Sequence, residues 1–410
     1  RIRAANPRYA ELTHPAAPTI EELRRELLDD RVVAAEYWLG DEQSYLWVVS
    51  RDALHAFTLP PRATIESAAR VLRERILAPA NLAASMPIEQ RAATEAAALD
   101  ATRAAAASLA AMILPAQSRR LLGNDVALVA DGELLTLPFA ALDDAASPRA
   151  YAYLPSLGTL RGLRALTRSR APGNAIAIIA DPVFRADDER LHAKAAAASS
   201  EPSDALVLRA ASEAGIANLP RLPHTRDEAD AIAKLADRNA SWIALDFAAN
   251  RAAAIGADWK RYAIAHFATH ALVNDRHPEL SGIVLSLYDS HGNAEDGFLR
   301  VDDLYNLHLP ADLVVLSVCE SAVGRSVGGE GPANLARAFF YAGSPRVVAS
   351  LWPVDDRASV AFMRAFYASL LEKGSRPQNA LVDAQQALRA NPRWQAPYYW
   401  SGYVLEGDWR

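Results

Sequence analysis

The sequence predicts an α/β fold: a mostly parallel sheet flanked by helices, joined to an N-terminal accessory α+β subdomain. The first observation is a set of short, nearly continuous apolar runs after residue 170, typical of strands that are covered on both faces. The second is that helical segments separate these runs, as they do in parallel sheets. The third is length, because 410 residues exceed the size at which one hydrophobic core stops growing.

Residues 30–165 are predicted to form the accessory part, since β-like alternation and helical spacing both occur there. We expect hairpins over residues 31–59 and 126–139, and helices over residues 64–78 and 88–113. The turns Gly40-Asp41-Glu42 and Asp131-Gly132 define the hairpins. Residues 1–29 are polar, with one expected helix over 19–28, and are interpreted as a linker from a missing upstream region, because the chain starts without Met.

Residues 166–410 are predicted to carry the parallel sheet. The expected strands are 175–179, 242–244, 262–268, 313–318 and 346–351, and the expected helices are 225–236, 332–342, 357–371 and 377–389. A hairpin is expected from 283–287 to 297–299 around the turn His291-Gly292-Asn293. The Ala/Ser-rich stretch within 185–211 fits either a mobile loop or a helix with a frayed end, and it is also a candidate for self-cleavage.

Composition narrows the partners and the compartment. The net charge of −6 argues against nucleic acid or an anionic membrane as the main partner. The longest apolar stretch, residues 104–116, is shorter than a membrane span. The single cysteine excludes internal disulfides and a Cys-based zinc site, and it fits a reducing, cytoplasmic compartment. No cofactor and no metal are expected.

Two chemically reactive residues end apolar runs of the predicted sheet. His270 ends the run from residue 262, and Cys319 nearly ends the run from 312. In open α/β sheets, function collects at the carboxyl ends of strands. A thiol nucleophile needs a nearby base, and the two residues, 49 positions apart (319 − 270), can be neighbours if their strands are adjacent. The backbone amides of Cys319 and of Ala271, in the expected loop after His270, are candidates for the oxyanion hole.

Other motifs are weaker or absent. The chain has no Gly-x-Ser-x-Gly sequence, which argues against a serine hydrolase of that class. The segment from Gly324 to Gly331 lacks the Lys-Ser/Thr ending of a phosphate loop, so we interpret it as a flexible wall beside the cleft. His266 lies deeper in the same strand as His270, where a structural role is expected. His277 and His291 have no spacing that supports a metal site.

The residues resemble the CHAT domain family in an ordered series of segments between about 30 and 410. These segments are His-Phe-Ala-Thr-His-Ala (266–271), Pro-Glu-Leu-Ser-Gly (278–282), Leu-Ser-Val-Cys-Glu-Ser (316–321), Gly-Glu-Gly (329–331), Ala-Arg-Ala-Phe (336–339), Ala-Ser-Leu-Trp-Pro-Val-Asp-Asp (349–356), and the upstream stretches 132–142, 180–182 and 222–229. Two positions depart from the family pattern: Val318 and Ser321 stand where Ala and Thr or Gly are frequent.

The family is similar to caspases and separase, which are cysteine endopeptidases with a His–Cys dyad on an α/β sheet. The resemblance implies a caspase-like fold in which His270 is the dyad histidine and Cys319 the nucleophile. It also suggests, by analogy with separase, that Asp356, or else Asp355, binds a basic side chain at P1, the residue before the scissile bond. The alternative from the residues themselves is an acidic N-cap of the following helix, and both roles can hold together.

Two functions from different classes follow from the resemblance. The first is a bacterial-type cysteine endopeptidase that acts on a specific protein partner and is latent until activated. The second is a non-catalytic CHAT-fold scaffold or regulatory interaction module. CHAT domains often follow tetratricopeptide repeats, so such repeats or an activating protein are the expected partners upstream of residue 1.

Overall fold

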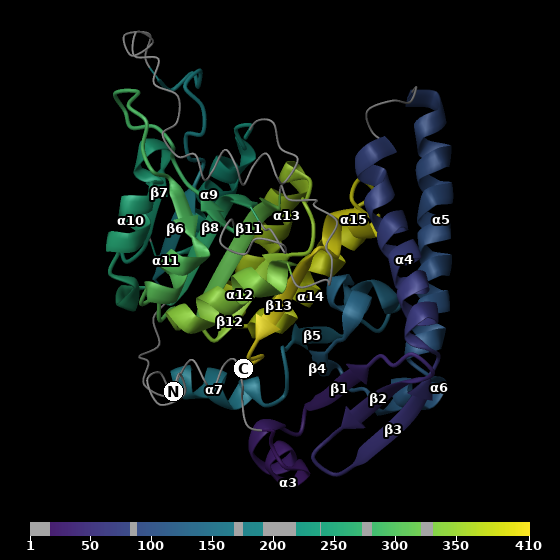
Figure 1. Cartoon of the computed structure of the whole chain (residues 1–410). Helices are drawn as coiled ribbons and strands as arrows, with labels where there is room; N and C mark the ends of the chain where they lie inside the picture. Colours follow the sequence, from purple (N-terminus) through teal and green to yellow (C-terminus); the bar gives the residue numbers. More distant parts are fainter. Residues whose placement is uncertain are drawn as a thin grey trace. The chain divides into compact units, whose positions relative to one another are not determined.

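The structure is a computed structural model. It describes residues 17–82, 88–167, 175–191, 219–237, 239–272, 281–320 and 331–410. Contacts divide the chain into two compact units: unit 1 comprises Arg1–Gly162 and Ser375–Arg410, and unit 2 comprises Leu163–Gly374 (Figure 1). The segment Ser375–Arg410, which the sequence analysis grouped with the second part, therefore lies with the first. Most of the Ala/Ser-rich stretch, from residue 192 onward, lies outside the described residues.

Unit 2 is built on five parallel strands. In spatial order they are β7 (Trp242–Leu245), β6 (Ile176–Ala180), β8 (Ile264–Leu272), β11 (Leu313–Glu320) and β12 (Arg346–Ser350). Every residue of β8 is buried, as expected for a strand covered on both faces. The five strands predicted from apolar runs are all present, with ends shifted by up to four residues.

A hairpin extends the sheet along the last residues of β8. β9 (Gly282–Val284) pairs antiparallel with His270 to Leu272, and β10 (Phe298–Arg300) pairs antiparallel with β9. The predicted hairpin is confirmed. β6 pairs with β8 only as far as Ala268. Beyond that residue, β9 pairs with the same edge of β8.

Helices cover both faces of this sheet, and alternate residues of β8 mark the two faces. His266 contacts Tyr367, which ends α13, whereas the ring of Phe267 lies 5.9 Å from Trp259 and 5.7 Å from Phe339 on α12. The helical elements of unit 2 are α9 (His224–Leu235), η4 (Asp246–Ala248), α10 (Arg251–Gly256), η5 (Trp259–Arg261), α11 (Val301–Asn306), α12 (Gly331–Ala342), α13 (Asp356–Tyr367) and η7 (Ala368–Glu372). α7 (Thr159–Thr167) spans the boundary between the units.

Unit 1 carries a second set of strands, parallel at one end and antiparallel at the other. In spatial order they are β13 (Tyr403–Gly407), β5 (Ala150–Tyr153), β4 (Asp125–Val129), β1 (Val32–Trp38), β2 (Ser44–Val49) and β3 (Leu54–Leu59), with antiparallel pairing only between β1, β2 and β3. The helical elements are α3 (Ile20–Glu22), η1 (Leu23–Leu27), α4 (Arg62–Leu82), α5 (Ile88–Ile113), α6 (Ala116–Leu121), η2 (Gly132–Thr136), η3 (Phe139–Leu142), α14 (Pro377–Arg389) and α15 (Pro397–Trp400). The predicted hairpin over 31–59 is confirmed and gains a third strand, β3.

The second predicted hairpin, over 126–139, is wrong. β4 pairs parallel with β1 on one side and with β5 on the other, so it has no edge for a hairpin partner. The apolar run after Gly132 instead forms the two short helices η2 and η3. Leu134, Leu137 and Phe139 bury their side chains from these helices, which explains a hydrophobic pattern that resembled a strand.

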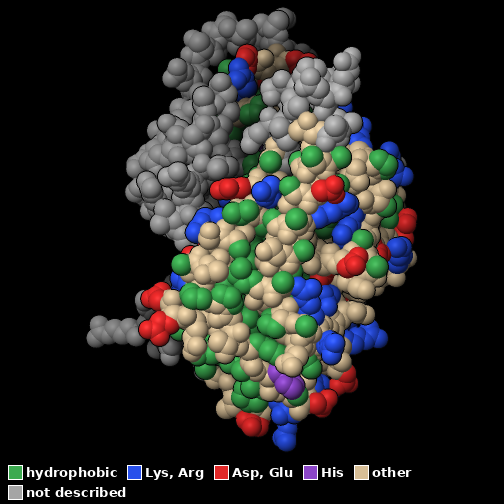
Figure 2. All heavy atoms as spheres, turned by 90° about the vertical axis from the view of Figure 1, so that its right-hand side faces the viewer, with side chains coloured by type: hydrophobic (Ala, Val, Ile, Leu, Met, Phe, Trp, Pro, Cys, Tyr) green, Lys and Arg blue, Asp and Glu red, His purple; other side chains and the backbone are tan. Residues whose placement is uncertain are grey.

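Helix α5 contains a longer apolar segment than the sequence analysis counted. Thr94–Ile113 spans 20 residues, which is long and apolar enough to cross a membrane by length and composition alone, and about 33% of its apolar window is buried in the protein. One such helix is weak evidence for a membrane span. Figure 2 shows this side of the molecule, where hydrophobic side chains are interspersed with charged ones. Asp100 and Arg103 of α5 form one such exposed ion pair.

A glycine in the hairpin of unit 2 provides a test of the fold. A Cβ atom at Gly297 would overlap the carbonyl oxygen of Ser286 and would lie 2.8 Å from that of Leu285. We expect Gly297→Ala to lower the free energy of unfolding by about 1–3 kcal/mol, because the two backbone segments beside β9 and β10 must separate. Gly256→Ala is the matched control, since a Cβ at Gly256 meets nothing within 4 Å. Urea denaturation measures both, and equal stabilities would contradict the close approach.

Candidate active site

The carboxyl ends of β8 and β11 lie side by side. The two strands pair in parallel from Leu313 and Ile264 onward, and this register places Cys319 opposite His270. Neighbouring strands are about 4.8 Å apart, so the two backbones are adjacent. The predicted neighbourhood of the strands is therefore present. The side chain of Cys319, and the Gly-rich segment up to residue 330, lie outside what the structure describes.

The imidazole of His270 is held by its surroundings. Only 3% of the residue is exposed, and the ring of Phe184 packs against it at a centroid distance of 4.8 Å. Nε2 lies 2.7 Å from the carbonyl oxygen of Pro220. Because a carbonyl only accepts hydrogen bonds, Nε2 carries the proton, and Nδ1 is the basic nitrogen of the neutral ring. Burial lowers the pKa of His270, and the hydrogen bond to Pro220 partly opposes this shift.

Ala271 lies inside a strand and not in a loop, contrary to the expectation. β8 continues to Leu272, with Ala271 in register with Ile283 on one side and with Glu320 on the other. The side chain of Ala271 is fully buried. The strand extends because the hairpin strand β9 supplies a pairing partner beyond the end of β6. An oxyanion role for the amides of Ala271 and Cys319 stays a prediction.

The two candidate specificity residues have different roles in the structure. Asp355 is the N-cap of α13, because its Oδ1 accepts hydrogen bonds from the amides of Arg357 (3.1 Å) and Ala358 (2.9 Å). The alternative N-cap role is thus present, on Asp355. Asp356 is half-buried in the first turn, and its Oδ2 accepts a 3.3 Å hydrogen bond from the amide of His224. Burial raises the pKa of the Asp356 carboxyl, and nearby His224 partly opposes the shift.

A polar cluster that the sequence analysis missed lies beneath the strand ends. Glu228 of α9 is 1% exposed, and its Oε1 lies 2.8 Å from Nε2 of His266. Its Oε2 accepts hydrogen bonds from the hydroxyls of Ser317 (3.0 Å) and Ser359 (3.1 Å). Nδ1 of His266 lies 3.0 Å from the hydroxyl of Tyr367. His266 therefore has the structural environment that its position predicted, but its partners come from distant helices and leave no local signal.

This cluster should contribute strongly to stability. Glu228→Ala leaves the buried hydroxyls of Ser317 and Ser359 without their shared carboxylate acceptor and removes the charge beside His266, and we expect it to lower the free energy of unfolding by about 3–5 kcal/mol. Glu228→Gln, the matched control, keeps one carbonyl acceptor and should cost less. Urea denaturation measures both variants. An alanine variant as stable as the parent would show that the cluster adds nothing.

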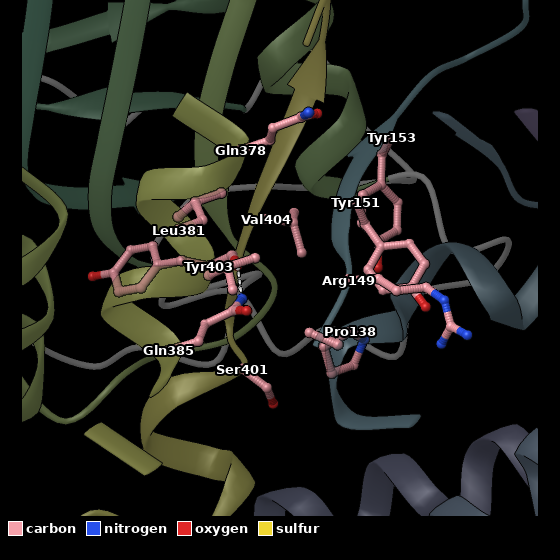
Figure 3. Close-up of a pocket in the computed structure, with 12 residues that line it drawn as sticks. Pro138, Arg149, Tyr151, Tyr153, Gln378, Leu381, Gln385, Ser401, Tyr403 and Val404 are labelled. Carbon is pink, nitrogen blue, oxygen red and sulfur yellow. Dashed lines mark hydrogen bonds between the residues drawn. The ribbon is translucent and has the colours of Figure 1, made fainter. Parts of the chain in front are cut away.

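Two described cavities lie away from His270. A groove of about 370 Å³ is lined by residues such as Trp259, Lys260 and Leu307, which precede β8 and β11 and so lie at the opposite end of the sheet from His270. A cavity of about 10 Å³ lies within unit 1, between α14 and β5 (Figure 3). The buried amide of Gln378 lines this cavity and has no hydrogen-bond partner among the described residues. Its volume fits about one water molecule, which would satisfy that amide.

Most of the sequence matches one known protein family. The CHAT domain model matches residues 95–408, which is most of the chain. The chain belongs to the CHAT domain family. Tetratricopeptide repeat protein 28 of Mus musculus is 39% identical over 110 residues, and its Homo sapiens counterpart is 37% identical over 110 residues. The match covers 27% of this chain but only 4% of each relative. Both relatives are mammalian, and a bacterial origin stays a prediction.

A solved structure supports the predicted fold class. The Saccharomyces cerevisiae separase–securin complex, at 3.0 Å resolution, contains a chain similar to this one with a TM-score of 0.55 and 10% identity. The similarity covers 95% of this chain and 30% of that chain. At this identity the likeness concerns the fold alone. The predicted caspase-like architecture, a mostly parallel sheet flanked by helices, is confirmed.

Among the described residues, no group of three or more His, Cys, Asp or Glu side chains could hold a metal ion. His291 is exposed, and its Nδ1 lies 3.7 Å from Asp289. His277 falls outside the described residues.

Proposed function

We propose that this CHAT domain is a cysteine endopeptidase in which Cys319 is the nucleophile and His270 the general base and acid. The observation that carries the proposal is the register of β8 and β11, which sets the only cysteine of the chain opposite a histidine at the carboxyl ends of two adjacent parallel strands. Strand ends of this kind are where α/β sheets gather their reactive groups. The separase-like fold and the family membership support the same reaction class.

The geometry of His270 fits the proposed chemistry. Its Nε2–H donates to Pro220, so Nδ1 takes the proton from the thiol. The sulfur then attacks the peptide carbonyl, and His270 returns the proton to the leaving amine as the carbon–nitrogen bond breaks. Water cleaves the resulting thioester and regenerates the thiol. Backbone amides, Ala271 and Cys319 by proposal, stabilise the oxyanion of each tetrahedral intermediate.

For specificity, we propose that Asp356 binds a basic P1 side chain. Asp355 is the weaker candidate, because one of its carboxylate oxygens already caps α13. Within the described part of the chain, the Asp356 side chain accepts one long hydrogen bond, of 3.3 Å from a backbone amide, and burial raises its pKa. Burial removes water from this carboxylate, and one long hydrogen bond offsets little of that cost. A guanidinium or ammonium partner would therefore stabilise its charged form strongly.

A thiol-reactive peptide probe tests the proposal. The intact protein should be labelled, and Cys319→Ala should not, since the chain has no other thiol. The alternative is a non-catalytic scaffold that binds a protein partner. In that case, a probe with a peptide recognition element and a substrate peptide would each react with the protein no faster than with free cysteine. The substrate in the proposal is a protein, with tetratricopeptide repeats or an activating protein as further partners.

A further inference from the structure

Three arginine side chains contact one buried carboxylate in unit 2. The side chain of Asp181 has no exposed surface. Arg221 contacts it with two parallel bonds, Nε to Oδ1 at 3.0 Å and Nη2 to Oδ2 at 2.9 Å. Nε of Arg226 lies 2.9 Å from Oδ2, and Nη1 of Arg190 lies 3.0 Å from Oδ1. Such paired, charge-assisted bonds fix geometry as well as contribute energy.

The backbone of this cluster is strained. Asp181 follows β6 with φ of 47°, and Asp246 follows β7 with φ of 53°. Among the described residues these are the non-glycine positions with positive φ. Asp246 accepts from both Arg190 (2.9 Å) and Arg226, so the same arginines bind both strained residues. Strain of this kind persists only where surrounding contacts hold it, and it gathers at functional sites.

The cluster is connected to the candidate active site through one peptide unit. Arg221 directly follows Pro220, whose carbonyl oxygen accepts the hydrogen bond from Nε2 of His270. Pro220 has no N–H, so its own residue cannot donate to the sheet. The Pro220 carbonyl belongs to the peptide unit that joins Pro220 to Arg221, so the bonds between Arg221 and Asp181 constrain its position. The nearby hydroxyl of Thr225 adds a contact, because it accepts from the amide of Asp181 at 3.1 Å.

We propose that Asp181 and Arg221 are positioning residues that hold the Pro220 carbonyl against Nε2 of His270 and thereby select the imidazole tautomer with Nδ1 as the base. The part of this inference that concerns catalysis rests on the proposed function. The part that concerns the tautomer does not, because it is a property of the resting protein. We call the paired bonds between Asp181 and Arg221 the clamp. Without the clamp, Nε2 of His270 loses its acceptor, and the tautomer with the proton on Nδ1 becomes populated. That form cannot take a proton from the thiol at Nδ1.

Arg221→Lys tests the clamp, because lysine keeps the charge but cannot make the two parallel bonds to Asp181. Arg226→Lys is the matched control: Arg226 also bonds Asp181 and Asp246, but it lies in α9 and does not adjoin Pro220. Nitrogen-15 NMR of the histidine side chains reports tautomer and pKa without any substrate. In Arg221→Lys we expect the Nε2–H fraction of His270 to fall and its pKa to drop further, and in Arg226→Lys we expect neither change.

Kinetics adds a second readout. Arg221→Lys should lower kcat by a factor of about 10–100 with KM within twofold, since substrate contacts are untouched and only the base is displaced. An unchanged His270 tautomer in Arg221→Lys, or an equal change in Arg226→Lys, would overturn the clamp. If the tautomer changes but the parent protein cleaves no peptide, the clamp stands and the protease proposal fails. If the parent protein cleaves peptides but the His270 tautomer is unchanged in Arg221→Lys, the protease proposal stands and the clamp fails.

Discussion

Replacing His270 by alanine should reduce kcat/KM for a cleavable peptide by a factor of about 10²–10⁴, the usual contribution of a positioned acid–base group. Cys319→Ala should remove turnover altogether, because no other thiol can form the thioester. His291→Ala is the matched control, since the His291 side chain is 82% exposed and lies outside the site. Equal activity of His270→Ala and His291→Ala would contradict the proposed dyad.

The pH dependence of the reaction follows from the burial of His270. Its pKa is lowered below the ordinary value of 6.5, so the neutral, basic form persists to lower pH than in an exposed histidine. The acidic limb of kcat/KM should accordingly lie below pH 6.5. The sign for stability follows too: the unfolded chain binds the proton more readily, so this residue makes the fold less stable as pH falls below about 6.5. His270→Ala should lose that part of the acid dependence.

Asp356→Asn should abolish a preference for basic P1 residues without destabilising the fold. Asparagine keeps an acceptor for the amide of His224 but removes a half-buried charge whose pKa is raised by burial. We expect kcat/KM for P1 Arg and Lys peptides to fall about 100-fold, and the melting temperature to stay equal or rise.

In the parent protein, the preference for P1 Arg should weaken as pH falls through the raised pKa of Asp356, because the protonated carboxyl no longer attracts a cation.

The neighbouring aspartate offers a matched control for this prediction. Asp355→Asn also removes one charge, yet asparagine caps helices as well as aspartate does. Its P1 preference and stability should match those of the parent protein. Comparing cleavage of P1 Arg, Lys, Asp and Leu peptides by the three proteins decides the matter. A parent protein that prefers Leu or Asp at P1 would show that Asp356 is not a basic-residue pocket.

Much of unit 2 could be predicted from the sequence because its strands are covered on both faces. Such strands appear as unbroken apolar runs, and the polar residues Thr269-His270 and Cys319-Glu320 mark where two of these runs stop. The pattern does not give strand order. That His270 and Cys319 lie opposite each other depends on the pairing of β8 with β11, which is a property of the whole sheet.

The errors have physical causes of the same kind. The run after Gly132 is apolar because its side chains fill the core from short helices, and a hydrophobic pattern alone does not distinguish these from a strand. The groups around His270 come from distant parts of the chain, since Pro220 is 50 residues away and Phe184 lies after β6. Segments 180–182 and 222–229 resemble the CHAT family, but neither contains a sequence signal that Asp181 binds Arg221.

The central claim is that His270 activates Cys319, and the pH dependence of alkylation of this single thiol tests it most directly. An unassisted cysteine has a pKa of about 8.5 and reacts slowly with iodoacetamide at pH 6. We predict that Cys319 in the folded protein reacts at pH 6 at least about tenfold faster than in the unfolded protein, and that His270→Ala removes this advantage. A folded protein whose thiol titrates near pH 8.5, with the same profile in His270→Ala, would contradict the account.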